Sequence, residues 1–135
     1  MLDERSAIKL IKLKFMDMEQ VMIIPLLDGG FFSARWAKDG IMVDNLGFFP
    51  LLPWIIFTEV IKFLKGKNGR AEMGDPYSIK LGNDGIALES IEGHVASVVY
   101  GKKNGDVVLR RISPISAILV WAGICENTPN ELILR

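Results

Sequence analysis

The stretch that decides the fold is Ser90 to Ile124, SIEGHVASVVYGKKNGDVVLRRISPISAILVWAGI. Two apolar segments in this stretch flank a polar turn that carries basic side chains. Nothing else in the chain joins candidate core residues so closely to candidate surface charges. Most of what the sequence predicts about structure and function depends on how this stretch folds.

The first segment, residues 90–100, favours a helix. Ser90 is suited to the N-cap, Glu92 is placed to interact with the helix dipole, and Gly101 can end the helix in the left-handed conformation. Four apolar residues recur at the spacing of one helix face: Ile91, Val95, Val98 and Val99. Residues 95, 97 and 99 also alternate as a strand would, so a strand remains the alternative.

The second segment predicts a buried helix that begins at Ser113-Pro114. Serine is a good capping residue, and proline fits the first helical position because no amide hydrogen is needed there. Gly123 follows as a stop signal. One face holds Ile115, Ile118, Leu119 and Ala122. The run from Ile112 to Cys125 carries no charge, so it is expected to be buried on most sides, and its period alone does not exclude a strand.

The composition describes a folded domain without a charge bias. The chain has 135 residues, of which 50% are hydrophobic and 24% charged, which suits a packed core. One domain is expected, or two small lobes that share a core. Sixteen basic residues balance sixteen acidic ones, so contact with nucleic acid or an anionic membrane would need a local patch.

Redox and targeting signals are sparse. The single cysteine, Cys125, permits no internal disulfide, and its apolar neighbours predict an unreactive core thiol. The N-terminal residues lack the continuous apolar region of a secretory signal. The longest uncharged runs, 45–58 and 112–125, are shorter than the roughly 20 residues that cross a bilayer. We therefore expect a cytoplasmic protein without a membrane-embedded part.

Residues 7–48 predict a small antiparallel meander. The pair Asp39-Gly40, between two alternating runs, is typical of a hairpin turn. Such a sheet has one apolar face and needs a second layer to cover it. The candidate strands are Lys12–Phe15, Val21–Ile24, 32–36 and 41–43.

The covering layer is predicted at Pro53–Leu64, where Trp54, Phe57 and Ile61 recur at helical spacing and Pro53 suits the first turn. Beyond it, we expect a short strand within 70–75, and a surface loop or one short helix at 75–87. A turn at 126–130 then leads to a closing strand at 132–134.

The order of these elements resembles the winged helix-turn-helix superfamily over residues 52–135. In those domains a second helix supports a recognition helix, and a Gly-Leu or Gly-Ile step leads into a β-hairpin wing. Here Gly123-Ile124 would be that step and 126–130 the wing tip. The likeness is one of layout and not of a specific motif.

Two features depart from the superfamily pattern. Pro114 would fall inside a recognition helix that began at Asp106, where a proline costs about 3 kcal/mol. Either that helix kinks, or residues 107–112 form a strand and only 114–122 are helical. The insertion at 75–87 is also long for a compact three-helix unit.

We therefore predict an α+β fold in two parts. Residues 1–50 would form an antiparallel β-meander that packs on a helix, and residues 51–135 a helical part with a winged-helix-like ending. A single core shared by both parts is the alternative.

The resemblance implies binding to duplex DNA in a regulatory or accessory role. From Lys102 to Arg111, four basic residues less the single Asp106 leave a net charge of +3. Four phosphate contacts give only weak, salt-dependent binding to DNA. Useful affinity would therefore need a homodimer or a protein partner. Basic residues that would face phosphates are Lys102, Lys103, Arg110 and Arg111, and Asn104 and Ser113 would add hydrogen bonds to the backbone.

Other chemistry has less support, and a hydrolase that uses His94 is the most distant alternative. His94, the only histidine, lies near Glu92, but no motif supplies a nucleophile for it to activate. The zinc-ligand spacings and the glycine pattern of a phosphate-binding loop are absent from the sequence, so we expect no metal and no cofactor.

The aromatic residues of the first half predict a seam between sheet and helix. These residues are Phe31, Phe32, Trp36, Phe48, Phe49, Trp54 and Phe57. If some of them form an exposed patch, the alternative function gains support, namely a protein-interaction or oligomerisation module without nucleic acid.

Overall fold

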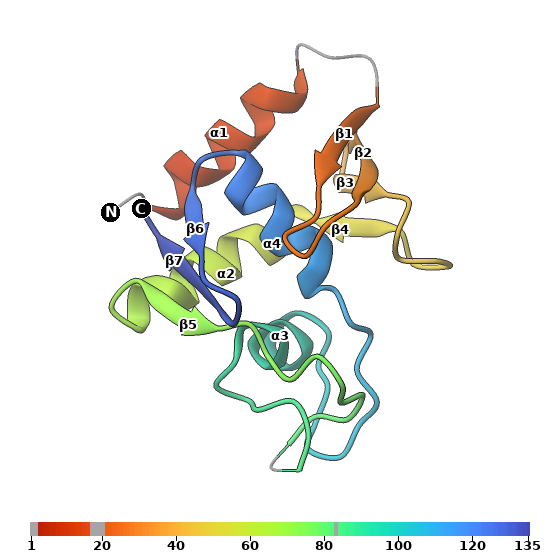
Figure 1. Ribbon diagram of the computed structural model, residues 1–135, viewed down its shortest axis with the longest axis vertical. Helices are drawn as coiled ribbons and strands as arrows, with labels where there is room; N and C mark the ends of the chain where they lie inside the picture. Colours follow the sequence, from red (N-terminus) through yellow and green to blue (C-terminus); the bar gives the residue numbers. More distant parts are fainter. Residues whose placement is uncertain (1–2, 17–20, 83) are drawn as a thin grey trace.

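The alternating residues of the first half build an antiparallel sheet of four strands in chain order, β1-β2-β3-β4 (Figure 1). The computed structural model describes residues 3–16, 21–82 and 84–135. The strands are β1 (Met22–Pro25), β2 (Phe31–Ala37), β3 (Gly40–Val43) and β4 (Leu51–Pro53). The predicted hairpin about Asp39-Gly40 is confirmed, because Ala37 pairs with Gly40. The fourth strand was not predicted.

Period-two alternation divides this sheet into a buried face and an exposed face. On the buried face Ile24 stands opposite Phe32, and Ile41 opposite Leu52. Helix α4 (Ile112–Trp121) contacts β1, helix α1 (Glu4–Met16) contacts β2, and helix α2 (Trp54–Gly66) contacts β4. The predicted second layer therefore exists, and three helices form it.

Residues 12–15 belong to helix α1, so the predicted strand at Lys12–Phe15 is wrong. The buried positions of α1 follow the helical period, at Ala7, Ile11 and Phe15. The misleading alternation comes from lysines that cover aromatic rings. Lys12 Nζ lies 5.0 Å from the centroid of Trp54, and Lys14 Nζ lies 4.9 Å from that of Trp121. Long lysine side chains can cover apolar surface with their aliphatic stems. In the sequence, the same lysines read as the polar positions of an alternating strand.

The second half of the chain contains a three-stranded sheet of order β5-β7-β6. The elements of this second half are α2, β5 (Arg70–Glu72), α3 (Ile91–His94), the π-helical η1 (Val95–Val99), α4, β6 (Cys125–Asn127) and β7 (Glu131–Leu134). Helix α4 contacts both β1 and β6, and it lies between the two sheets (Figure 1). The predicted α+β class is confirmed.

One cluster of buried residues runs through both parts of the chain. It includes Ile24 and Leu52 from the first sheet, Ile61 and Ile118 from α2 and α4, and Leu132 from the second sheet. A smaller cluster, Leu81, Ile86, Ala96 and Val108, lies under the loop that follows β5. Among the described residues, no helix is long and apolar enough to cross a membrane.

Residues 91–99 are helical, but the predicted apolar face is only partly correct. Ser90 caps the helix by accepting a hydrogen bond from the Gly93 amide at 3.1 Å, as predicted. Tyr100 N–H then donates to Val95 O, five residues back, which is the π-helical pattern. Val98 lies within this wider turn and is 53% exposed, although the regular helical period predicted it buried.

Helix α4 begins at Ile112, one residue before the predicted cap at Ser113. Pro114 is therefore the third helical residue, where its missing amide hydrogen still leaves no intrahelical bond unmade. The segment before it, 107–111, forms no ladder and makes only an isolated bridge between Lys80 and Val107. Gly123, with φ +77°, ends the helix as predicted.

Gly40 tests how tightly β3 and β4 approach. A Cβ at this position would lie 2.0 Å from the carbonyl oxygen of Leu52. We expect Gly40→Ala to lower the free energy of unfolding by at least about 2 kcal/mol, because the strands must separate. Urea denaturation followed by circular dichroism measures the change.

The matched control is Gly66→Ala at the end of α2, where a Cβ would meet nothing within 4 Å. Alanine is the better helix former, so this variant should be equally stable or more stable, by less than about 1 kcal/mol. Equal stabilities for the two variants would contradict the close approach of β3 and β4.

Candidate interaction surface and ligand cleft

The structure separates the six residues predicted to contact DNA. Arg110 and Arg111 are turned into the protein, whereas Lys103, Asn104 and Ser113 are exposed and Lys102 is partly buried. The expected row of four outward cations is therefore not formed. Each residue is held by local contacts that explain its direction.

Arg111 is only 3% exposed and connects three separate elements. Its Nη1 donates to the carbonyl oxygens of Phe49, at 2.8 Å, and Leu51, at 3.3 Å. Its guanidinium carbon lies 5.1 Å from the ring centroid of Tyr100, at the end of η1. Nε has no partner among the described residues. This side chain therefore fastens the start of α4 to the first sheet and to η1, and it cannot reach a phosphate.

Arg110 is held by acceptors from one loop and one helix. Its Nη1 donates to the carbonyl oxygens of Asp75 and Ser78, and its Nε lies 3.3 Å from Oε1 of Glu92. With 26% of its side chain exposed, Arg110 is not fully buried. Arg110 thus orders the loop after β5.

Glu92 is the buried carboxylate between these arginines, with 1% exposure. The backbone amide of Arg111 donates to both of its oxygens, at 3.0 and 3.2 Å. Burial raises the pKa of Glu92 above its ordinary value, although these hydrogen bonds and the nearby arginines act in the opposite direction. The carboxylate fixes the residue from which α4 starts.

Sequence reasoning placed Glu92 at a helix end as a dipole partner and missed this role. A signal was available, because Glu92 is the only acidic residue of segment 90–101, in which most other residues are apolar or small. The uncharged run from Ile112 begins directly after Arg110-Arg111, which is where a buried carboxylate finds its counter-ions.

Lys102, Lys103 and Asn104 lie on a separate turn, and Ser113 lies at the start of α4. Lys103 donates its backbone amide to Oδ2 of Asp106 at 2.7 Å, so Asp106 organises the turn. Asn104 covers Gly82, where a Cβ would lie 1.8 Å from the asparagine Oδ1. Ser113 lines a cleft at the start of α4. The helix that the resemblance assigns to recognition is buried from Pro114 to Leu119.

Residues with reactive side chains are occupied in structural contacts. His94 stacks on Phe63, with ring centroids 4.5 Å apart, and its Nε2 lies 3.3 Å from Oε2 of Glu59. Cys125 is buried, which raises the pKa of its thiol to about 12, as expected of an unreactive core cysteine. Within the described residues, no group of three or more potential ligands from His, Cys, Asp and Glu could hold a metal ion.

The exposed face of the four-stranded sheet is mostly apolar, with Ser33 and Arg35 of β2 as its polar residues. Ile23 stands opposite Ser33, Pro25 opposite Phe31, and Met42 opposite Leu51. Ile23 is 59% exposed and Phe31 is 70% exposed. An antiparallel sheet with one solvated face normally carries polar residues there, so this face departs from the usual pattern.

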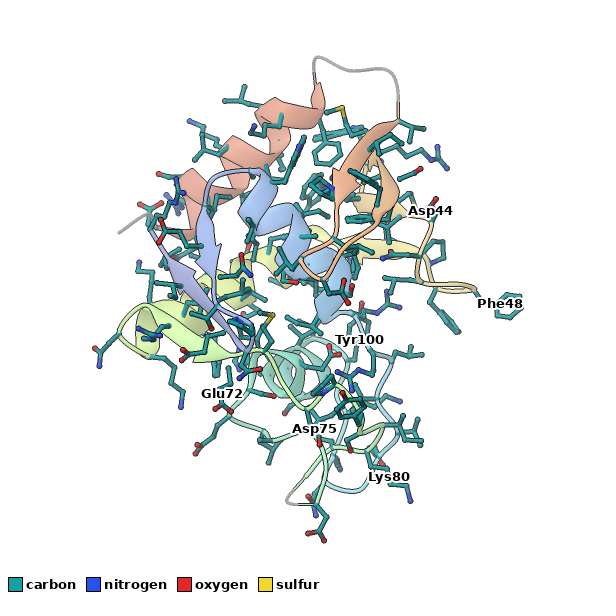
Figure 2. The ribbon with its side chains drawn as sticks, viewed as in Figure 1. Asp44, Phe48, Glu72, Asp75, Lys80 and Tyr100 are labelled. Carbon is teal, nitrogen blue, oxygen red and sulfur yellow. The ribbon has the colours of Figure 1, made fainter. Side chains whose placement is uncertain are left out.

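Next to this face, the loop between β3 and β4 presents Phe48 to solvent. Phe48 is 98% exposed and points away from the body of the protein (Figure 2), and Phe49 is 57% exposed. A shallow groove of about 310 Å³ lies on the same face, lined by Val21, Ser33, Ala34, Arg35, Met42, Val43, Asp44 and Pro50. We call these residues, together with Ile23, Phe31, Phe48 and Phe49, the outer sheet face.

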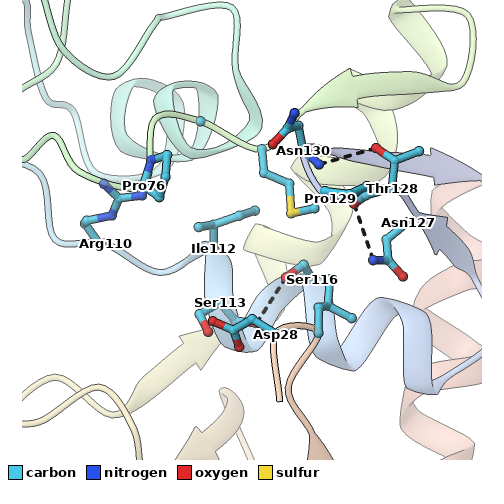
Figure 3. A pocket seen from close by; sticks show the side chains of 13 residues that line it. Asp28, Pro76, Arg110, Ile112, Ser113, Ser116, Asn127, Thr128, Pro129 and Asn130 are labelled. Atoms are coloured by element: carbon cyan, nitrogen blue, oxygen red, sulfur yellow. Dashed lines mark hydrogen bonds between the residues drawn. The ribbon is translucent and has the colours of Figure 1, made fainter. Parts of the chain in front are cut away.

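A second, larger cleft of about 620 Å³ lies where the two parts of the chain meet (Figure 3). Four segments line it, namely the β1–β2 loop, the residues after β5, the start of α4 and the tip of the β6–β7 hairpin. The lining residues are Leu27, Asp28, Met73, Gly74, Pro76, Arg110, Ile112, Ser113, Ser116, Asn127, Thr128, Pro129 and Asn130.

Arg111→Met tests whether the buried guanidinium holds the halves together. The variant leaves the Phe49 and Leu51 carbonyl oxygens without their donor and removes one positive charge beside buried Glu92. We expect a loss of about 3–5 kcal/mol in unfolding free energy. Lys103→Met, at an exposed position of the same basic stretch, should change stability by less than about 0.5 kcal/mol. Similar losses for both variants would contradict the role given to Arg111.

Glu92→Gln tests the raised pKa of the buried carboxylate. The folded state holds the Glu92 proton more tightly than the unfolded chain does. The contribution of Glu92 to the free energy of unfolding therefore falls as pH rises from the ordinary pKa of 4.5 through the raised pKa of the folded state. The unfolding free energy of the wild type minus that of the variant should therefore fall with rising pH, by at most about 1.4 kcal/mol per pH unit. Denaturation at a series of pH values measures it, and a difference that rises with pH would refute the shift.

Comparison with known proteins finds no matching family model, no matching curated protein and no matching solved structure. The winged-helix resemblance therefore stays a prediction, and any functional conclusion has to come from the surfaces described above.

Proposed function

We propose that this protein is an interaction module that self-associates through the outer sheet face. The observation that carries the proposal is the mostly apolar outer face of the β1–β4 sheet, on which Ile23 and Phe31 are left exposed by the described chain. Exposed apolar surface gathered on one face of a sheet is typical of a protein contact site.

The aromatic side chains of this surface suit an interface core. Phe48 and Phe31 are 98% and 70% exposed, and an aromatic side chain buries about 150–250 Å² when it is covered. Residues of this type dominate the binding energy of protein interfaces when they enter a pocket on the partner.

A second copy of the chain is the partner that fits this surface. Phe48 lies two residues before Pro50, which lines the groove together with Met42, so a two-fold axis near this loop would bring the ring of each copy toward the groove of the other. Arg35 and Asp44, of opposite charge, line the same groove and would complement each other across that axis.

Duplex DNA is the less favoured partner. Arg110 and Arg111 are engaged in contacts inside the protein. Of the predicted basic patch, this leaves Lys102 and Lys103, which form no ion pair with the described carboxylates. Two phosphate contacts give little affinity at physiological salt. A DNA test should reverse only these lysines, because reversing the arginines would place new charge in the core.

Self-association is tested by sedimentation equilibrium over a range of protein concentrations. The wild type should form a dimer, and Ile23→Lys combined with Phe48→Ser should be monomeric, because the two changes remove the ring and place a charge on the sheet. Tyr77→Ser is the matched control, since Tyr77 is 93% exposed but lies in the 75–87 loop. This control should dimerise like the wild type.

A wild type that stays monomeric throughout, or a double variant that dimerises as well as the wild type, would overturn the proposal. A monomer that shifts duplex DNA, and loses this shift in Lys102→Glu/Lys103→Glu, would instead support DNA binding. Thermal unfolding of every variant shows whether the fold is intact.

A further inference from the structure

We propose that the cleft at the junction of the two halves is a binding site for a short zwitterionic peptide of two or three residues. Its volume of about 620 Å³ falls within the range of ligand pockets, which commonly lie between two structural units. The site is separate from the outer sheet face, so it does not depend on the proposed function.

Arg110 provides the group that would bind the peptide carboxylate. Its Nη1 and Nε are engaged by the loop carbonyl oxygens and by Glu92, whereas its Nη2 forms no hydrogen bond with the described residues. The engaged atoms fix the guanidinium in place at the wall of the cleft, which Arg110 lines. A charge-assisted hydrogen bond from arginine is among the stronger contacts available to a carboxylate.

Asp28 provides the opposite charge for the peptide ammonium group. It comes from the β1–β2 loop and lines the same cleft as Arg110, although the two residues belong to different halves of the chain. One cation and one anion on the wall favour a ligand that carries both charges, and disfavour a simple anion, which Asp28 would repel.

The remaining wall suits the body of a peptide. Leu27, Met73 and Ile112 offer apolar contact for a side chain. Asn127 and Asn130 carry amide groups that can both donate to and accept from a peptide bond. Figure 3 shows these asparagines at the hairpin tip, across the cleft from Arg110. The cleft thus presents groups for each part of a short peptide with an apolar side chain.

The test is an NMR titration of the full chain with the dipeptide Ala-Leu, its N-acetylated form and its C-amidated form. Ala-Leu should bind saturably and shift the backbone amides of Ile112, Ser113 and Asn130. Each blocked form should bind at least about tenfold more weakly, because one charge contact is lost. Asp28→Asn should weaken the binding of Ala-Leu to a similar extent. In this variant, N-acetylation of the peptide should change the affinity very little.

Asp84→Asn is the matched control, since Asp84 is an exposed carboxylate that does not line the cleft. It should bind all three ligands like the wild type. No saturable binding up to about 10 mM, amide shifts confined to other surfaces, or blocked forms that bind as well as Ala-Leu would each overturn the proposal. These outcomes are independent of the oligomeric state.

Discussion

The structure depends on one buried constraint, the pairing of Glu92 with the Arg110 side chain and with the backbone amide of Arg111. The carboxylate fixes the residue before α4, and the Arg111 guanidinium extends from that point to the β3–β4 loop. A buried charge is tolerated only when its hydrogen bonds are made. The position of Glu92 and the positions of Arg110 and Arg111 therefore depend on each other. The relative placement of sheet and helices follows from this contact more than from the apolar packing, which is less directional.

Much of the fold could be predicted because its signals are local. The hairpin at Asp39-Gly40, the α2 helix, the Ser90 cap and the stop at Gly123 each depend on a few neighbouring residues. The errors arose where a tertiary contact changed the local pattern. Lysines covering Trp54 and Trp121 imitated a strand in α1, and Val98 is exposed within the π-helical turn of η1.

The candidate site was harder to predict, since sequence does not tell which direction a charged side chain takes. Arg110 and Arg111 follow Lys102 and Lys103 within one short stretch, and the residue types alone do not tell which of the four side chains is turned inward. The partners that decide the difference, Phe49 and Glu92, are 62 and 19 residues away from Arg111. The cleft likewise combines four segments that are distant in the chain.

The single cysteine has a practical consequence. Cys125 lies in the shared core, at the start of the strand that pairs with β7, and its thiol holds its proton up to about pH 12. Only the deprotonated sulfur reacts with alkylating reagents, so in the native state this atom is shielded both by its neighbours and by its protonation. The rate of thiol modification therefore reports how often the second sheet opens, without an engineered label.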